Sequence, residues 1–205
     1  MSKKLIITFE GIEGSGKSLH IKSVESYLKK KKIIFIKIRE PGGSKNAEKI
    51  RSLILNKKAN FNKHTDLLLY LASRSENIDT IINKNYRKKV ILIDRFADST
   101  IAYQHYGMGI NKKLINYINK YLLKKIKVDF TFLNVVSKKN LFERLRKRKH
   151  LNRYDKFKYS FYQKVQRGYL KLANNKKKYL VVNSDFSINY NKKIIENKIN
   201  QLLKI

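Results

Sequence analysis

The sequence contains no cysteine, which excludes disulfides and thiolate chemistry. Its four histidines, His20, His64, His105 and His150, are scattered and include no pair at the spacing of metal ligands. No apolar run approaches the roughly 20 residues that cross a bilayer. The N-terminus also lacks the apolar segment and the cleavage site of a signal peptide. These absences predict a cytoplasmic protein without a membrane span.

Acidic residues are scarce as well. The chain has 48 lysines and arginines against 15 aspartates and glutamates, and its net charge is +33, whereas a small domain carries roughly 2–8 charges. One interpretation is a nucleic-acid-binding protein, because dense cationic side chains displace counterions from a phosphate backbone. The other is a biased composition rich in lysine, asparagine and isoleucine. We favour the second, since the lysines are spread along the whole chain, and we expect no specific nucleic acid as a partner.

Linkers are missing too. No stretch rich in proline, glycine and serine divides the 205 residues, and there is no internal repeat. This length suits one domain with a full core. The one shift in composition is at residues 144–158 (RLRKRKHLNRYDKFK), which are strongly basic and have no apolar periodicity. We therefore expect a single domain over residues 1–205, with this basic segment inserted in it.

What the sequence does contain is a glycine-rich motif near its start. Residues 11–18, GIEGSGKS, match G-x-x-x-x-G-K-[ST] and follow the apolar run Leu5–Phe9. Strand, glycine loop and helix in this order predict a phosphate-binding loop, whose backbone N–H groups and helix N-terminus attract an anion. In such loops the lysine, here Lys17, contacts the β- and γ-phosphates, and the hydroxyl, here Ser18, binds Mg²⁺. The remaining residues of the expected nucleotide site are Gly11, Ile12, Glu13, Gly14, Ser15 and Gly16.

Five short apolar segments rich in Ile, Val and Phe predict buried strands separated by helices. They are Leu5–Phe9, Ile33–Ile38, Val90–Ile93, Phe130–Val136 and Tyr179–Val182. Near-continuous apolar strands that alternate with helices indicate a parallel sheet covered on both faces. We expect an α/β fold of the P-loop NTPase type, with a five-stranded parallel sheet and ligands beyond the carboxyl ends of its strands. Polar residues follow three of these strands, at Glu10, at residues 39–43 and at Asp94-Arg95.

The second strand ends at residues 39–43, Arg-Glu-Pro-Gly-Gly, which hold the only proline. Pro41 can form a simple turn or a cis peptide that bends the backbone toward a ligand, and the two isomers differ by only about 0.5–1 kcal/mol before proline. Beyond it, an apolar stripe from Ala47 to Ile54 indicates a helix. Arg51 points away from that stripe, and by itself it indicates only a solvated side chain.

Residues 66–82 predict a long amphipathic helix on which Tyr70 and Arg74 share a face. The ring and the guanidinium can simply pack, which the spacing alone favours. They can also hold a planar base, by stacking on the ring and by hydrogen bonding to the edge of the base.

The third strand ends at Asp94-Arg95 and leads into a helix with polar residues along one side. Asp94 either caps this helix or helps to hold the metal ion of a phosphate-loop enzyme. The glycine-rich loop upstream favours the metal role. The helical spacing places Arg95, Ser99 and Tyr103 on one stripe. Thr100 and Gln104 lie beside it.

The basic segment 144–158 has three interpretations. It can be a solvated surface run, or a nucleic-acid patch with Tyr154, Phe157 and Tyr159 between its cations. It can also be a lid, whose arginines neutralise charge during phosphoryl transfer and exclude water from the site. The lid best explains a basic run between two helical segments in the second half of a phosphate-loop fold.

Together these residues resemble the thymidylate kinase family of the bacterial type, which phosphorylates dTMP to dTDP with ATP and Mg²⁺. The resemblance covers nearly the whole chain. It rests on FEGIEGSGKS, REPGGS, EKIRSLIL, the Tyr70-x-x-x-Arg74 helix, DRFADSTIAYQ and the ending RGYLKLA. REPGG and DR-x-x-x-S-x-x-AYQ are together far more specific than the phosphate loop alone.

The resemblance implies roles at the phosphate and the sugar of the acceptor. Arg39, Arg51 and Arg95 fall where the family places groups near the 5′-phosphate, with Arg95 the strongest candidate. Glu13 is similar to the acidic residue that binds the 3′-hydroxyl. Tyr103 matches the ring that crowds the 2′ position, so a ribose should fit poorly.

The resemblance also implies contacts to the base. Tyr70 takes the place of an aromatic ring that stacks on thymine, and Arg74 matches the arginine that reaches a carbonyl of that base. The other implied substrate contacts are Pro41, Ser99, Thr100 and Gln104.

One branch of this family carries an arginine inside the phosphate loop, where this chain has Gly14. The other branch supplies the cation from the lid, and this chain has Arg146, Arg148 and Arg153 there. The chain therefore resembles the lid-arginine branch. Arg148 or Arg153 is then the group that meets the transferring phosphoryl, an effect worth about 10³–10⁵ in rate for arginine fingers.

The sequence thus predicts a nucleoside monophosphate kinase that transfers phosphate directly and in line, with ATP and Mg²⁺ as cofactors and dTMP as substrate. The family also implies a homodimer. Three positions depart from the family pattern: Asn152 in place of a carboxylate, Gln166 in place of a basic residue, and Tyr70, which adds a hydroxyl that needs a partner in a closed pocket. The alternatives are another small-acceptor kinase, such as a deoxynucleoside kinase, and a basic nucleic-acid-binding protein with a vestigial nucleotide site.

Overall fold

The structure, a computed structural model, describes residues 4–147 and 152–205. Its sheet has five strands in the order β2-β3-β1-β4-β5, and all neighbouring strands are parallel. The strands are β1 (Ile6–Glu10), β2 (Phe35–Arg39), β3 (Val90–Asp94), β4 (Phe130–Val135) and β5 (Tyr179–Asn183). The predicted parallel α/β sheet is confirmed. Four of the strands extend one residue beyond the predicted end, to the polar residue that follows the apolar run.

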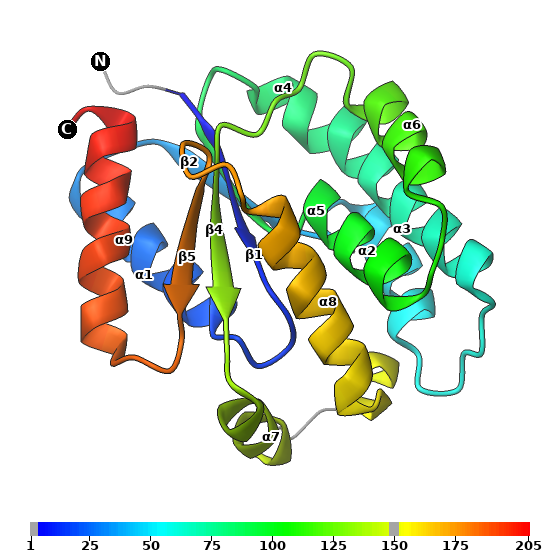
Figure 1. Cartoon of the computed structure of the whole chain (residues 1–205). Coiled ribbons are helices and arrows are strands. Elements are labelled where there is room, and N and C mark those ends of the chain that lie inside the picture. The colour runs from blue at the N-terminus through cyan, green and yellow to red at the C-terminus, as the bar shows by residue number, and fades with distance from the viewer. Residues whose placement is uncertain (1–3, 148–151) are drawn as a thin grey trace.

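Helices cover both faces of the sheet, as predicted. On one face lie α1 (Lys17–Lys30) and α9 (Ile188–Leu203), and α7 (Lys138–Arg146) lies beyond the tip of β4 (Figure 1). On the other side lie α2 (Lys45–Leu55), α3 (Lys63–Asn77), the π-helix η1 (Ile78–Ile82), α4 (Asn83–Asn85), α5 (Ala97–Thr100), the π-helix η2 (Ile101–Gly107), α6 (Lys112–Leu123) and α8 (Tyr159–Leu172). A short 3₁₀ helix, η3 (Arg153–Lys156), precedes α8.

The continuous apolar strands follow from this two-sided cover. In β1, Ile7 and Phe9 pack in one core cluster with Val24 of α1. The intervening Ile6 faces the opposite way, in a second cluster with Ile78. Because successive side chains of a strand point to opposite faces, a strand buried on both sides needs apolar residues at every position.

The parallel register gathers the polar strand ends at one edge. Phe9 of β1 and Arg39 of β2 both pair with Asp94 of β3. Glu10 and Arg95 therefore leave the sheet close to each other and to Arg39. This edge, beyond the carboxyl ends of the strands, is where open parallel sheets bind ligands.

The predicted helix over residues 66–82 is present as α3 and its continuation η1. Asn62 caps it, accepting the backbone N–H groups of His64 and Thr65, each at 3.0 Å. The helix after Asp94-Arg95 is different from the prediction, because only α5 is α-helical and η2 has π-helical turns. Among residues 4–147 and 152–205, no helix is long and apolar enough to span a membrane.

Candidate active site

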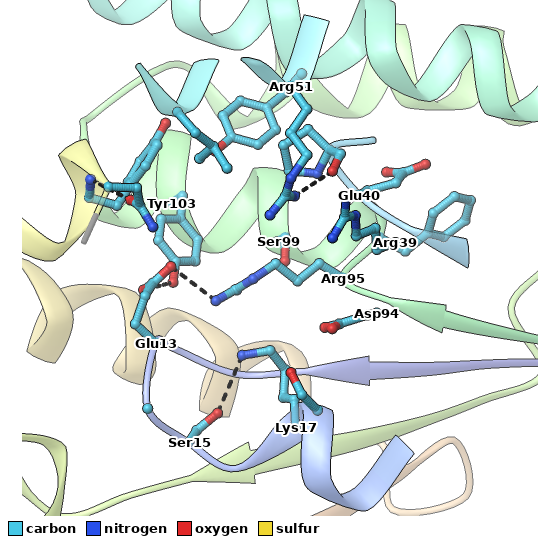
Figure 2. A pocket seen from close by; sticks show the side chains of 18 of the residues that line it. Glu13, Ser15, Lys17, Arg39, Glu40, Arg51, Asp94, Arg95, Ser99 and Tyr103 are labelled. Carbon is cyan, nitrogen blue, oxygen red and sulfur yellow. Dashed lines mark hydrogen bonds and ion pairs between the residues drawn. The ribbon is translucent and has the colours of Figure 1, made fainter. Parts of the chain in front are cut away.

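A cavity of about 510 Å³ lies at the carboxyl ends of the strands. This volume is within the range of roughly 300–1,000 Å³ that small-ligand sites occupy. Its walls come from the glycine loop after β1 and from the polar ends of β2 and β3, and α3 and η2 add further side chains (Figure 2). The sequence-predicted residues that line it are Glu13, Gly14, Ser15, Gly16, Lys17, Ser18, Arg39, Pro41, Arg51, Tyr70, Arg74, Asp94, Arg95, Ser99, Tyr103 and Gln104.

The glycine loop wraps around the amine of Lys17. Lys17 Nζ donates hydrogen bonds to the carbonyl oxygens of Gly11 (2.9 Å) and Ile12 (2.8 Å). Gly11 has a φ of 137°, and a Cβ atom there would lie 2.2 Å from the carbonyl oxygen of Asn134. Only glycine fits this position. The loop therefore holds the amine at the floor of the cavity in a conformation that larger residues would disrupt.

The charge of Lys17 is finely balanced. Burial, reinforced by the charge of Arg95, lowers the pKa of Lys17 to about 7, while Asp94 and Glu13 act in the opposite direction. An anion entering the cavity would favour the charged amine. The position beside Lys17 is therefore suited to a phosphate group, whereas an uncharged ligand would not stabilise the charged amine.

Arg95 faces Lys17 across the cavity (Figure 2). It has a φ of 65°, in the left-handed region that non-glycine residues seldom adopt. Its guanidinium donates to the carbonyl oxygen of Gly11 (2.7 Å), pairs with Glu13 (3.1 Å) and lies over the ring of Tyr103 (5.1 Å). Such a backbone conformation persists only where its surroundings enforce it, as at ligand sites.

Glu13 is held by two partners. Besides Arg95, the hydroxyl of Tyr103 donates to it at 2.5 Å. Burial alone would raise the pKa of Glu13, but Arg95 and Lys17 hold that pKa below its ordinary value. Glu13 therefore keeps its negative charge as a hydrogen-bond acceptor at the middle of the cavity wall.

Glu10, at the end of β1, organises the turn that carries Arg95. It is 1% exposed. Its carboxylate accepts the backbone N–H of Phe96 (2.7 Å) and the hydroxyl of Ser99 (2.6 Å). Ser99 also contacts the hydroxyl of Tyr169 at 2.7 Å. Ser99 thus orients the turn although it lines the cavity, and the predicted meeting of Arg95, Ser99 and Tyr103 is confirmed in space.

Asp94 does not cap a helix. The residue that precedes α5 is Phe96, whose side chain makes no cap hydrogen bond, so the capping interpretation is wrong. Asp94 Oδ1 is buried and has no hydrogen-bond partner within residues 4–147 and 152–205. It lies in the same cavity as Ser18, in the first turn of α1. An unpartnered carboxylate oxygen and a hydroxyl beside a phosphate site are hard oxygen ligands that suit Mg²⁺.

Two further arginines stand at the far end of the cavity. Arg39 is exposed and pairs with Glu48 at 2.9 Å. Arg51 donates to the carbonyl oxygen of Pro41 at 2.5 Å and lines the cavity (Figure 2). The interpretation of Arg51 as a solvated side chain is therefore wrong, because α2 turns it inward. The Glu40–Pro41 peptide is cis, which confirms the second of the two alternatives for Pro41.

Tyr70 and Arg74 of α3 have different surroundings. Tyr70 is half-buried at the cavity wall, and burial raises the pKa of its hydroxyl to about 12. Arg74 is 1% exposed. Its guanidinium pairs with Glu40 (2.8 Å) and donates to Asn119 (2.7 Å). Arg74 is thus mainly a packed residue whose guanidinium borders the cavity. Burial raises the pKa of Glu40 although this carboxylate is paired with Arg74.

Thr100 and Gln104 are each 1% exposed. Thr100 Oγ1 and Gln104 Nε2 have no partner in the part of the chain that the structure describes. Only Gln104 is among the cavity-lining residues. Buried polar atoms without partners are costly in an empty protein, and a ligand that satisfies Gln104 would remove that cost.

Three described residues of the basic segment line the cavity: Arg144, Asn152 and Tyr154. Arg144, at the end of α7, donates to the carbonyl oxygens of Gly14 (2.8 Å) and Ser184 (2.6 Å). Arg153 instead forms an ion pair with Asp66 of α3 and is not among the cavity-lining residues. Arg146 is exposed, and Arg148 lies outside the described residues.

Tyr154 follows Arg153 and does line the cavity. Its hydroxyl donates to Asp66 at 2.5 Å. Its ring makes edge contacts with Tyr70 (6.2 Å) and Tyr103 (6.0 Å). The end of the basic segment is therefore fastened to α3 and forms one wall of the cavity.

Comparison with known proteins agrees with this geometry. The family model described as thymidylate kinase matches residues 9–195. A thymidylate kinase of Acholeplasma laidlawii is 41% identical over 181 residues, 87% of this chain and 89% of that protein. A thymidylate kinase of Thermosipho africanus is 37% identical over 185 residues, 90% and 92% of the two chains. The chain belongs to the thymidylate kinase family.

A solved thymidylate kinase also has the same fold. The crystal structure of the enzyme from Ehrlichia chaffeensis superposes with a TM-score of 0.78 at 30% identity and covers 97% of this chain and 98% of its own. The expected family and the expected P-loop fold are both confirmed. The chain is a nucleoside monophosphate kinase.

Sequence reasoning missed several residues of this thymidylate kinase site. The local pattern marks Glu10 only as the end of a strand and does not indicate the contacts of Asp66, Arg144 and Tyr154. Each acts through a partner distant in the sequence, such as Asp66 with Tyr154, so no local spacing indicates it. Two of the three departures from the family pattern, Asn152 and Gln166, have structural roles. Asn152 caps η3 in a capping box with Asp155, and Gln166 forms two hydrogen bonds of 3.1 Å with the backbone of Val136.

Proposed function

We propose that the protein transfers the γ-phosphoryl group of ATP to dTMP and so makes dTDP, a step of dTTP synthesis. One observation carries the proposal. A single cavity has a glycine loop with Lys17 at one end and Arg39 and Arg51 at the other (Figure 2). Arg95 lies between them, and its guanidinium shares the carbonyl oxygen of Gly11 with the amine of Lys17. Two anionic nucleotides can therefore meet in it, with their phosphates between the two sets of cations.

The donor end is the glycine loop. Residues 11–18 offer backbone N–H groups at the N-terminus of α1, where the helix dipole favours an anion. Lys17 exchanges its bonds to the carbonyl oxygens of Gly11 and Ile12 for the β- and γ-phosphate oxygens. Ser18 and Asp94 would hold Mg²⁺, which neutralises phosphate charge and orients the two groups for transfer.

The acceptor end is the set of three arginines. Arg95 is the strongest candidate for the 5′-phosphate of dTMP, because its guanidinium is fixed by Glu13 and Gly11 before any ligand arrives. Arg39 and Arg51 line the same cavity farther from Lys17. A guanidinium offers paired donors that match phosphate oxygens. An acceptor without a phosphate would leave these cations unused, which argues against the deoxynucleoside kinase alternative.

The base and the sugar of dTMP would fill the rest of the cavity, beyond the arginines that bind its phosphate. Tyr70 would stack on thymine, with Arg74 and Gln104 at its edge and Pro41 beside it. Thr100 would contribute only after a small movement, since it is buried outside the cavity lining. Glu13 would accept the 3′-hydroxyl. Tyr103, held against Glu13 at 2.5 Å, would crowd a 2′-hydroxyl.

Transfer in this arrangement is direct and in line. The cavity brings acceptor and donor phosphates together, and no side chain needs to form a phosphoenzyme. Positioning and neutralisation of charge supply the rate. Lys17 stays protonated once the triphosphate is bound, because the anion raises its pKa again.

We propose that residues 144–158 are the lid of a single domain over residues 1–205. Arg144 supports this, since it joins α7 to the glycine loop at Gly14. Arg148 or Arg153 would meet the transferring phosphoryl. Arg153 has to leave Asp66 to do so, which favours Arg148.

The test is a coupled assay of ADP release with dTMP, dUMP, UMP and thymidine as acceptors. We expect dTMP to be preferred over dUMP by about 10-fold, since one methyl is worth roughly 1–3 kcal/mol in an apolar pocket. UMP and thymidine should be poor acceptors. Turnover of thymidine equal to that of dTMP would contradict the role of the three arginines, and equal use of UMP would contradict that of Tyr103.

We also propose that the protein is a cytoplasmic homodimer. Its substrates are multiply charged nucleotides, which do not cross membranes. Exposed apolar side chains lie on neighbouring helices, Leu68 on α3 and Tyr117 and Tyr121 on α6, with exposed fractions of 60%, 73% and 70%. A second copy is the partner that the family implies for such a surface. Sedimentation of the wild type and of Tyr117→Lys tests this, and a monomeric wild type would contradict it.

A further inference from the structure

The kinase reaction does not account for the excess of cations. Although the lysines are spread along the sequence, the fold gathers many of them at the edge of the sheet opposite the active site. They lie in the connections that lead into the strands, at residues 29–32 (KKKK), 87–89 (RKK), 124–127 (KKIK) and 176–178 (KKK). Each connection has three or four cations, and the one carboxylate among them is Asp129, just before β4.

The parallel topology brings these connections together. Because all five strands run the same way, all of them begin at one edge. Backbone hydrogen bonds join the neighbouring beginnings, from Val90 to Ile34 (3.2 Å), from Ile91 to Leu5 (2.8 Å) and from Thr131 to Lys178 (2.9 Å). Neighbouring strands lie about 4.8 Å apart, so the row is about 19 Å wide. Lys4, the first described residue, and Lys204, after the end of α9, lie at the same edge (Figure 1). We call these four connections, Lys4 and Lys204 the amino edge.

The cations of the amino edge are largely exposed. Within residues 4–147 and 152–205, none of them forms an ion pair with a carboxylate. The one carboxylate in these connections, Asp129, accepts the backbone N–H of Ile6 at 2.9 Å and offsets a single positive charge. The amino edge therefore keeps a large net positive charge.

We propose that the amino edge binds the sugar–phosphate backbone of nucleic acids without base specificity, while the kinase site works at the opposite edge. Duplex DNA carries one negative charge per about 1.7 Å, so a row of about 19 Å can face roughly ten phosphates. Lysines act as mobile point charges, which suits contacts that track a backbone and do not read bases. A membrane surface fits less well. Among the described residues of this edge, only two large apolar side chains, Ile34 and Ile205, are exposed, and interfacial binding needs a broad apolar face.

Two variants of equal charge test the proposal. The edge variant replaces six lysines of the amino edge by glutamine: Lys30, Lys31, Lys88, Lys125, Lys177 and Lys178. The control variant replaces six exposed lysines on helices elsewhere: Lys22, Lys45, Lys49, Lys113, Lys164 and Lys193. Affinity for a labelled duplex of mixed sequence is measured by fluorescence anisotropy across salt concentrations. Saturating dTMP and ADP are present throughout, so that the active site is occupied. A duplex RNA and vesicles with phosphatidylserine serve as further probes.

We expect the wild type to bind both duplexes, with log affinity falling steeply against log salt. Each lost phosphate contact lowers that slope by about 0.9, so the edge variant should bind at least about 10-fold more weakly at low salt. The control variant should stay within about 3-fold of the wild type, and both variants should retain wild-type kcat/KM for dTMP. Equal weakening in the two variants would overturn the proposal. So would a wild type that does not bind the duplexes, or one that binds vesicles more tightly. A wild type without kinase activity would instead contradict the proposed function and leave the binding test intact.

Discussion

The two edges of the sheet hold their cations in different ways. At the carboxyl edge, carboxylates fix the arginines, Arg95 by Glu13 at 3.1 Å and Arg74 by Glu40 at 2.8 Å. At the amino edge, the lysines are exposed and have no such carboxylate among the described residues. The cationic side chains are therefore held in fixed positions at the carboxyl edge of the sheet and are mobile at the amino edge.

This difference indicates that the fixed cations of the carboxyl edge act in the phosphoryl transfer, whereas the exposed cations of the amino edge attract anions. A cation that is fixed and partly buried keeps its geometry without a ligand, and its field is strong because little water surrounds it. An exposed lysine is screened by salt within about 10 Å at 0.1 M. Changes at the carboxyl edge should therefore alter turnover strongly at any salt concentration. Changes at the amino edge should be small for turnover and should depend on salt.

The largest effect is expected for Lys17→Ala. Without the amine, the donor phosphates lose their main side-chain cation, and kcat should fall by at least about 10²-fold. Affinity for dTMP, measured by calorimetry, should stay within about 3-fold of the wild type, because the acceptor end is unchanged. The control is Lys22→Ala, an exposed position on the same helix. A variant with wild-type kcat would remove Lys17 from its assigned role.

Two arginines at opposite ends of β3 compare the edges directly. Arg87 precedes the strand with a φ of 58°, and Arg95 follows it with a φ of 65°. Arg95→Gln should lower kcat/KM for dTMP by about 10²-fold, through the loss of a charge-assisted contact to phosphate. Arg87→Gln changes the same kind of residue in the same backbone conformation and should leave kcat/KM unchanged. Similar losses in the two variants would show that the effect comes from the strand and not from the site.

Binding of ATP should take up a proton. The pKa of Lys17 is about 7 in the empty site, so at pH 8 most of the amine is neutral, and the bound triphosphate restores its charge. Affinity for ATP should therefore weaken as pH rises above 7, by up to about 10-fold per pH unit. Calorimetry at pH 8 in two buffers of different ionisation enthalpy measures the uptake. Lys17→Arg, which stays charged, should show none, and an equal uptake in that variant would place the proton elsewhere.

A moderate effect is expected for Asp66→Asn. The change removes the ion pair to Arg153 and leaves an acceptor for the hydroxyl of Tyr154. The cavity wall made by Tyr154 should loosen, and KM for dTMP should rise by about 3- to 10-fold with a smaller change in kcat. Steady-state kinetics checks this against Asp79→Asn, an exposed aspartate on η1. Unchanged KM in Asp66→Asn would show that the ion pair does not position the wall.

The smallest effect is expected on the thermal stability of the protein when lysines of the amino edge are replaced. Its cations repel one another, so replacing Lys88, Lys125 and Lys177 by glutamine should raise Tm by roughly 1–2 °C at low salt. The gain should disappear at high salt, where the repulsion is screened. Scanning calorimetry at two salt concentrations measures it. A lower Tm at low salt would mean that these lysines have stabilising partners.

The sheet and the phosphate loop could be predicted from the sequence because their signals are local. The apolar run Leu5–Phe9 and the glycines of residues 11–18 lie next to each other, and the local pattern alone fixes strand, loop and helix. The arrangement of Arg95, Ser99 and Tyr103 was also predictable from spacing, although the π-helical turns of η2 were not. Asn119 and Asp66 could not be found in this way, because their partners lie far off in the sequence.

The gathering of lysines at the amino edge was hidden for a similar reason. Residues 29–32 and 176–178 are far apart in the sequence, and only the strand order shows that both lie at one edge. Along the chain they look like evenly spread charge. The parallel topology brings these lysines, which are spread along the chain, together at one edge of the sheet.

The most direct test is a crystal structure of the protein with dTMP and a non-hydrolysable ATP analogue. The account predicts that the acceptor phosphate lies at the Asp94-Arg95 turn, with thymine against Tyr70 and the triphosphate around Lys17. Thymidylate bound anywhere else, or a triphosphate that does not contact the glycine loop, would contradict it.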